Sequence, residues 1–325
     1  MSSNPYARQS QMWPLAEAVR AYVAPVNRNT ETSVPFDPSA QGEFDLDLPP
    51  EPFLDLGWVE NFQRVSATRH EALRTGALGC VTAQFTEQLD AMVEFDLPNW
   101  GKLQMAVAGG GQQINVLATS IASDIRSSGG TAVPAVYVQD GGSAAELPLA
   151  ADALASFRVG DMVAVDWDYQ GQAGYVGSGV AGTFVATALD AQSHVDLIRR
   201  VTFNVARVSN KTDTSLYLGQ ALIGGAQAGM GVQKVTALLD REGGNYYQEW
   251  AALFVIAGGA GGRMCFYYPR LQVAAGPSEV QRTVEGPLFS NMLHAKLRAL
   301  PSIDPNDGVT VLCYRSYFPA KNAKV

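Results

Sequence analysis

Hydrophobic and polar residues alternate along much of the chain, which is the pattern of β-strands that pack on one side and face solvent on the other. Residues 163–169 are the clearest case, because Val163, Val165, Trp167 and Tyr169 alternate with Ala164, Asp166 and Asp168. Residues 201–206 repeat this pattern. Residues 80–85 and 92–97 predict two more strands, which we expect to be joined by the polar turn 86–90.

Three longer segments are apolar on both sides of a predicted strand, namely 250–256, 264–272 and 310–318. A strand with this pattern is buried on both faces. We expect its cover to be either a second sheet or a neighbouring subunit.

Helical signals are few. Residues 98–108 end in three glycines, which favours a short helix with a glycine stop. Residues 288–300 lie between Pro287 and Pro301 and predict a second helix. Residues 15–23 also favour a short helix near the N-terminus. The chain is therefore predicted to be mainly β, with one or two short helices beyond its N-terminal segment.

The first 52 residues form a predicted arm. Its prolines, frequent between positions 25 and 52, exclude regular structure over most of its length. Acidic residues are common between Arg28 and Arg64, where no Lys or Arg occurs. Two interpretations remain open: a solvated leader, or an extended arm that becomes ordered on a neighbouring subunit. In the second interpretation the anchors are Phe36, Phe44, Leu46, Leu48, Phe53 and Leu54.

Composition narrows the class of protein. Hydrophobic residues make up 47% of the 325 positions, which is too apolar for a disordered chain. Charged residues make up only 17%, below the ~25% of typical soluble domains, so we expect partner subunits to cover part of the surface. No apolar run reaches the roughly 18 residues that span a bilayer, and no membrane partner is expected. The N-terminus lacks the pattern of a secretory signal, so we expect synthesis and retention in a cytoplasm.

The acidic balance bears on nucleic acid. A net charge of −8 argues against a protein that grips DNA or RNA, because such binding depends on Lys and Arg. It does not argue against a protein past which nucleic acid slides, since an acidic wall repels phosphate.

No catalytic pattern emerges, and we expect neither an enzyme nor a bound cofactor or metal. The three cysteines are far apart, and His70, His194 and His294 have no partner at metal-binding spacing. Residues 177–182 match GxGxxG but lack the acidic residue expected about 20 positions later. Asp166 and Asp168 would share one strand face at a separation compatible with a glycosidase pair, although a solvated strand face is a far commoner reason for such a pattern.

Two blocks of the chain resemble the major tail tube proteins of long-tailed bacteriophages. The first consists of residues 54–62, a hairpin, and residues 93–109, whose second half is similar to the family's short helix. The second block is 248–272, which contains the apolar strand 265–271 together with Glu249, Leu253 and Phe254. The segment between the two blocks fits the family poorly.

The resemblance implies a tail-tube-type β-sandwich or barrel whose sheets join those of neighbouring subunits. It divides the chain into an extended arm over 1–52, the first part of a tube-type domain over 53–125, an inserted or second β domain over 126–240, and a C-terminal tube-type region over 241–325. A ring would then contain six single-domain chains or three double-domain chains.

The function implied by the resemblance is that of a structural virion protein, assembled in the host cytoplasm into stacked rings that form the tail tube. DNA would pass through the tube without specific binding, and the further partners would be a tape-measure protein and a tail terminator. The predicted subunit contacts are Phe36, Phe44, Leu46, Phe53, Trp58, Phe62, Trp250, Phe254, Phe266 and Tyr268. Two alternatives remain: another structural or decorating virion protein, or a carbohydrate-acting β-sandwich that uses Asp166, Asp168, Trp167 and Tyr169.

Overall fold

The chain folds into two compact units built mainly from antiparallel β-sheets, which confirms the predicted mainly-β class. Unit 1 combines Ser33–Trp100 with Trp250–Val325 and the N-terminal Met1–Ala24, and unit 2 consists of Gly101–Glu249 with Pro25–Thr32. The computed structural model describes residues 16–26, 36–76, 79–118, 133–167, 197–241, 248–258, 262–276, 278–285 and 288–318. The boundary of the inserted unit thus lies at Trp100 and Trp250, whereas the sequence suggested positions 125 and 240.

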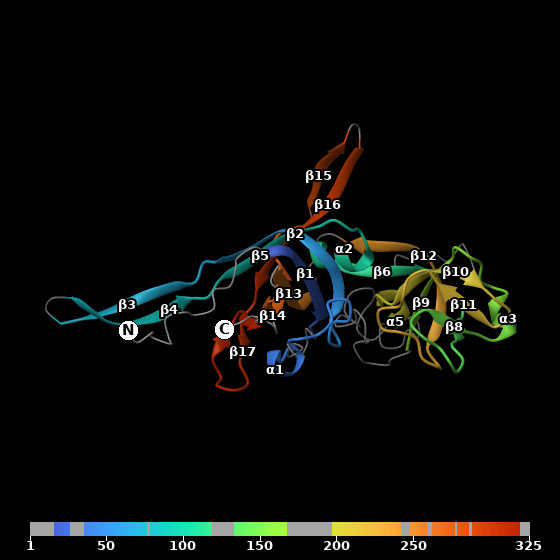
Figure 1. Cartoon of the computed structure of the whole chain (residues 1–325), viewed down its shortest axis with the longest axis horizontal. Coiled ribbons are helices and arrows are strands. Elements are labelled where there is room, and N and C mark those ends of the chain that lie inside the picture. Colours follow the sequence, from blue (N-terminus) through green and yellow to red (C-terminus); the bar gives the residue numbers. More distant parts are fainter. Residues whose placement is uncertain are drawn as a thin grey trace, which may run out of the picture. The chain divides into compact units, whose positions relative to one another are not determined.

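Unit 1 is a closed barrel with projecting hairpins (Figure 1). Its sheet runs in the order β16, β5, β2, β1, β13 and β14, and it closes because β14 pairs again with β16. Two further strands, β15 and β19, pair with β16 and β14 outside this ring. The strands are β1 Ala16–Pro25, β2 Leu54–Ser66, β5 Ala91–Leu97, β13 Glu249–Gly258, β14 Arg263–Val273, β15 Ser278–Glu285, β16 Leu288–Ala299 and β19 Tyr314–Phe318.

Aromatic side chains fill the barrel of unit 1. The ring of Phe254 lies 4.9 Å from Phe62, 5.3 Å from Phe95 and 6.1 Å from Tyr268, measured between centroids. These residues come from β13, β2, β5 and β14, so one aromatic cluster joins four strands of the barrel. Strand β5 shows the sequence logic, because its buried positions Val93, Phe95 and Leu97 alternate with residues that point outward.

Two predicted helices are strands. Of the predicted helix 15–23, residues 16–23 lie in β1, in the middle of the barrel sheet, where Val19 pairs with Val59 of β2. Residues 288–300 form β16, where buried Leu293, Ala295 and Leu297 alternate with outward residues at a period of two. In both cases pairing with neighbouring strands outweighs the helical preference of an Ala- and Leu-rich segment.

The helix predicted over 98–108 is present as α2, Lys102–Gly109. It ends where Gly110 adopts a left-handed conformation with φ of 59°, and the Gly110 amide donates to the carbonyl of Ala106. This is the glycine stop that the sequence indicated.

The strands predicted over 80–85 and 92–97 exist but do not pair with each other. The first belongs to β4, Cys80–Gln88, which pairs with β3, Arg69–Thr75. The second belongs to β5, which pairs with β2. The Ala67 amide donates to the carbonyl of Asp90, so the β3–β4 hairpin continues the β2–β5 pair beyond the barrel. The predicted turn at 86–90 was therefore wrong.

A short hairpin separates β16 from β19. It consists of β17, Ser302–Ile303, and β18, Thr310–Val311. The predicted single strand 310–318 is consequently broken between Val311 and Tyr314. Between β1 and β2, one helical turn, α1 (Pro38–Gln41), is capped by the Asp37 side chain.

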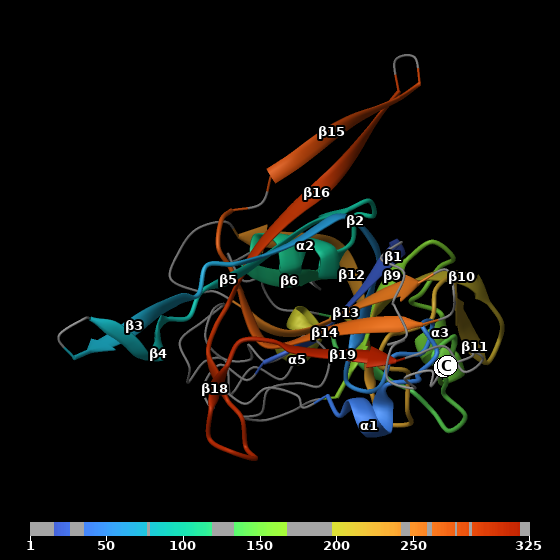
Figure 2. The ribbon, with the colours of Figure 1, turned by 60° about the vertical axis from the view of Figure 1, so that its left-hand side comes forward.

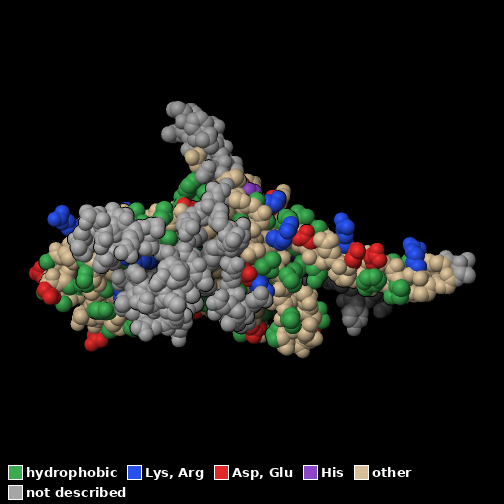
Figure 3. All heavy atoms as spheres, turned by 180° about the vertical axis from the view of Figure 1, so that it is seen from behind, with side chains coloured by type: hydrophobic (Ala, Val, Ile, Leu, Met, Phe, Trp, Pro, Cys, Tyr) green, Lys and Arg blue, Asp and Glu red, His purple; other side chains and the backbone are tan. Residues whose placement is uncertain are grey.

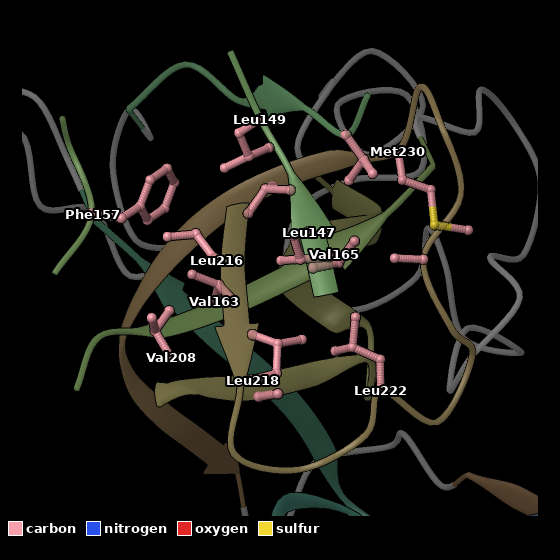
Figure 4. Packing of buried hydrophobic residues seen from close by; sticks show 14 of the residues in the cluster. Leu147, Leu149, Phe157, Val163, Val165, Val208, Leu216, Leu218, Leu222 and Met230 are labelled. Carbon is pink, nitrogen blue, oxygen red and sulfur yellow. The ribbon is translucent and has the colours of Figure 1, made fainter. Parts of the chain in front are cut away.

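Unit 2 is a curled sheet around its own core (Figure 4). The sheet runs in the order β6, β12, β9, β10, β11 and β8, with β7 also paired to β12. The Gln139 amide donates to the carbonyl of Pro148 at 2.8 Å, which brings the ends of the sheet together. Its elements are β6 Gln112–Leu117, β7 Val136–Tyr137, β8 Glu146–Pro148, α3 Ala151–Leu154, β9 Met162–Asp166, α5 Leu197–Val201, β10 Val205–Lys211, β11 Ser215–Leu218 and β12 Gly231–Arg241.

The core of unit 2 confirms the strand predicted from residue 163 as β9 but not its solvated face, because Ala164 and Asp166 are buried as well. It also revises a second predicted strand. Val163 and Val165 of β9 point into the cluster shown in Figure 4, where they meet Leu147 and Leu216. The strand predicted over 201–206 starts only at Val205, because Val201 ends α5 and residues 202–204 form the connection to β10. Residues 168 and 169 and the GxGxxG segment 177–182 lie outside the described residues.

Candidate assembly surfaces and a buried polar cluster

The β3–β4 hairpin is solvent-exposed on both faces. All of its residues are exposed except the partly buried Ala72, and the large apolar side chains Leu73 and Phe85 are 51% and 52% exposed. The hairpin extends well away from the barrel of unit 1, and green and charged side chains alternate along it (Figure 3). Exposed apolar side chains of this size on a projecting element mark an interaction site.

The register of the hairpin brings its two most exposed large apolar residues to one face. Leu73 lies opposite Ala83, and Phe85 lies opposite Glu71, so these four side chains share a face. Within the described residues, β3 and β4 form a two-stranded sheet of their own. Such a sheet is marginally stable in water, and burying its apolar face against a partner would stabilise it.

Unit 1 also carries strand edges at which further pairing is possible. Strands β15 and β19 lie at the two ends of the sheet order, each with one paired side among the described residues. The β15–β16 hairpin projects from the barrel on a different course from the β3–β4 hairpin (Figure 2). Open strand edges are templates for pairing with another chain.

Most predicted anchors of the N-terminal arm pack on the arm's own barrel, whereas Leu48 is 73% exposed. Phe36 and Phe53 are buried and lie 5.9 Å and 6.4 Å from the ring of Tyr267 on β14. Phe44 lies 5.4 Å from Tyr22 on β1, edge to face. The idea of an arm that is ordered only by a neighbour is therefore wrong for residues 36–53, which cover the outer side of the barrel.

Polar contacts fix the same segment. The Tyr22 hydroxyl donates to the carbonyl of Leu46 at 2.8 Å. The Arg20 guanidinium forms ion pairs with Asp47, at 2.6 Å, and with Asp55. Trp58, 43% exposed, stacks against Arg20 at 5.3 Å. Trp58 thus keeps substantial accessible surface, while Leu46, another predicted contact residue, is partly buried.

The remaining predicted contacts lie inside the barrel. Trp250, Phe254 and Tyr268 have no exposed surface, and Phe266 is buried. Phe62 is partly buried against Phe254. On the outer side of β14, Phe36 and Phe53 of the chain's own segment 36–53 pack against Tyr267. Within the single chain, the barrel core thus already covers Trp250, Phe254, Phe266 and Tyr268.

Unit 2 contains a buried polar cluster that the sequence did not reveal. It combines side chains from α2, β6, β9 and α5 and from the segment after α5. Its members are Lys102, Asn115, Asp166, Arg199, Arg200, Thr202 and Asn204, all buried. Charged side chains are almost never this deeply buried without specific partners, so the cluster needs a physical explanation.

Lys102 lies at the centre of the cluster. Its Nζ donates to the carbonyls of Val201 and Thr202, at 2.9 Å and 2.5 Å, and lies 4.7 Å from the ring centre of Phe203. Burial holds the pKa of the Lys102 amine well below its usual value, while the charge of Asp166 opposes that shift. The carbonyls belong to the C-terminal end of α5, where a positive charge is favourable.

Asp166 is the carboxylate of the cluster. Burial raises its pKa to about 6, and the Thr202 side chain, the Trp167 amide and the charges of Arg199 and Lys102 oppose the rise. Because Asp166 is only 2% exposed, it does not lie on an open face where a carbohydrate could bind. Asp168 and Tyr169, its proposed companions, lie outside the described residues.

The cysteines give a direct test of these surfaces. Cys80 is exposed on the β3–β4 hairpin, whereas Cys265 is buried in β14. Burial raises the pKa of the Cys265 thiol to about 12, and only the thiolate reacts. We expect iodoacetamide at mildly alkaline pH to modify Cys80 of the native, dissociated chain within minutes and to leave Cys265 intact, as measured by peptide mass mapping. Equal labelling of both would contradict this arrangement.

The described residues show neither a metal-binding cluster nor a membrane-spanning helix. Among the described residues, no three His, Cys, Asp or Glu side chains gather as a metal site would require. The His294 Nδ1 atom lies 2.7 Å from Asp96 across the β16–β5 pair. Within the same part of the chain, no helix combines the length and apolar character needed to span a bilayer.

Comparison with known proteins adds no assignment. No protein-family model matches the chain, and no curated protein matches it.

Proposed function

We propose that this chain is a self-assembling structural subunit of a bacteriophage tail tube. The observation that carries the proposal is the β3–β4 hairpin, a projecting two-stranded sheet with an uncovered apolar face. A neighbouring copy of the same chain is the partner that would cover this face in every subunit of a homo-oligomer. The tail tube is the assembly suggested by the resemblance of residues 54–109 and 248–272 to that family.

The closed barrel changes how subunits would join. Because β14 and β16 close the sheet within unit 1, neighbours would attach through the hairpin and through the edges of β15 and β19. Rings of six chains, or of three if unit 2 serves as a second tube-type domain, would then stack into a tube. A tape-measure protein and a tail terminator are the further partners of such a tube, and the virion tail is its location.

Overall charge supports a passive conduit for DNA. With a net charge of −8, the chain offers little to hold phosphate, so DNA would pass through without specific binding. A second virion role, such as a decorating protein, would use the same hairpin to dock on a surface formed by other proteins. The carbohydrate-acting alternative loses support because Asp166 is buried.

Negative-stain electron microscopy of the purified full chain tests the proposal. We expect rings or hollow tubes of uniform bore, and the thiol of Cys80 should become protected from iodoacetamide as they form. Monomers that persist at high protein concentration, with Cys80 still reactive, would overturn it. Retention on a DNA column that weakens with salt would overturn the passive conduit.

A further inference from the structure

Two nitrogen atoms from different elements of unit 2 converge on one carbonyl oxygen. Lys102 Nζ, at the start of α2, donates to the Thr202 carbonyl at 2.5 Å. Asn115 Nδ2, on β6, donates to the same oxygen at 3.0 Å. The Lys102 amine and the Asn115 amide are therefore neighbours, because the distance between their nitrogen atoms cannot exceed the sum of the two hydrogen-bond lengths.

Their surroundings suit a reaction between them. Lys102 is 8% exposed and Asn115 is completely buried, so water has little access to either group. The ring of Phe203 covers one side of the amine. Desolvation favours the uncharged amine, which is the nucleophilic form of lysine, and holds the pKa of Lys102 well below its usual value.

A carboxyl group that can carry a proton is close by. The charge of Asp166 acts on the Lys102 amine, and its own side chain contacts Thr202, the residue whose carbonyl holds both nitrogen atoms. Its raised pKa, about 6, lets it take up and release a proton near neutral pH. Within the described residues, Asp166 Oδ2 and Asn115 Oδ1 are both buried without a hydrogen-bond partner. Such orphan atoms are rare and often mark reactive sites.

We propose that Lys102 and Asn115 become joined by an intramolecular amide bond. The lone pair of the neutral Lys102 amine attacks Asn115 Cγ, and a new bond forms between Nζ and Cγ. Asp166 accepts a proton from the attacking nitrogen and delivers it to Nδ2, whose bond to Cγ breaks. Ammonia leaves, and one amine and one primary amide have become one secondary amide. The reaction needs no oxidant, metal or second substrate, and it stands independently of the proposed tube.

The alternative is a purely structural lysine that ties α2 to the end of α5 through two carbonyls. That interpretation accounts for the hydrogen bonds of Lys102. It gives no role to Asn115 Oδ1 or to the buried carboxyl of Asp166. The two interpretations predict different masses for the chain, so mass spectrometry separates them without any assay of function.

The experiment is mass spectrometry of the purified full chain. We expect an intact mass lower by one ammonia than the sequence requires. Trypsin cannot cleave after an acylated lysine, so the peptides 75–102 and 103–126 should be replaced by one internally linked peptide, 75–126. Recovery of both separate peptides at their sequence masses would overturn the proposal. A deficit of one water would also overturn it, because it would place the bond on a carboxylate.

Two variants test the proposed roles of Lys102 and Asp166. Lys102→Arg keeps a long side chain with hydrogen-bond donors but cannot form the amide, so its mass should equal that of its sequence. Asp166→Asn should leave Lys102 and Asn115 unlinked while the peptide map is otherwise unchanged. If Asp166→Asn links as completely as the unaltered chain, the role of Asp166 is wrong. If either variant fails to fold, the map of the unaltered chain still decides whether the bond exists.

Discussion

Replacing Leu73 and Phe85 together by aspartate should abolish assembly while leaving the fold of the monomer intact. Both side chains are about half exposed on one face of the β3–β4 hairpin, so the change costs the isolated chain little. In an interface, two carboxylates would be buried without partners, at a cost of at least about 1.4 kcal/mol each. Together they should raise the protein concentration needed for rings at least about 100-fold. Electron microscopy and analytical ultracentrifugation measure this directly.

A matched control adds the same charge to the opposite face of the hairpin. Gln84 lies opposite Ala72, and Thr86 opposite His70, so Gln84→Asp with Thr86→Asp alters the other face. We expect this variant to form rings at nearly the normal concentration. If the Leu73 and Phe85 variant assembles as well as the control, the apolar face of the hairpin is not the interface.

The strand content could be predicted from the sequence, whereas the pairing of strands could not. The alternation in β5 and β9 and the continuous apolar run in β14 are local information, and they predicted these strands correctly. The pairing of β14 with β16, which closes the barrel, joins residues whose sequences show no sign of each other. β1 and β16 were mistaken for helices because Ala- and Leu-rich segments satisfy both periods until a neighbouring strand selects one.

The surfaces were harder to foresee than the strands. The sequence identified Phe36, Phe53 and Phe254 as large apolar side chains available to a partner, but the barrel itself buries them. Leu73 and Phe85 have the same character and remain exposed, because β3 and β4 extend beyond the barrel. Whether an apolar residue serves the core or a partner depends on where its strand lies, and one sequence does not contain that information.

The buried polar cluster was missed for a related reason. The sequence predicted the helix 98–108, which contains Lys102, but it predicted no role for the Lys102 or Asn115 side chains. The turn between α2 and β6 and the packing of α5 against β6 bring both side chains to the carbonyl of Thr202. One signal was available in principle: a Lys that opens an otherwise apolar helix is a candidate for burial.

The aromatic core of unit 1 should be the largest single contribution to the stability of that unit. Phe254 has no exposed surface and contacts rings from three other strands, so Phe254→Ala leaves a cavity that the barrel cannot close. We expect a loss of about 3–5 kcal/mol in the free energy of unfolding, measured by urea denaturation of the dissociated chain.

Phe85→Ala is the matched control for this prediction, because it removes the same side chain from an exposed position of the same unit. Its effect on the dissociated chain should stay within about 0.5 kcal/mol. The two variants thus separate the two uses of phenylalanine in this molecule: Phe254 should affect unfolding, and Phe85 should affect assembly. Equal loss of stability in both would mean that the hairpin is part of the cooperative core, and its proposed role as a free docking element would then fail.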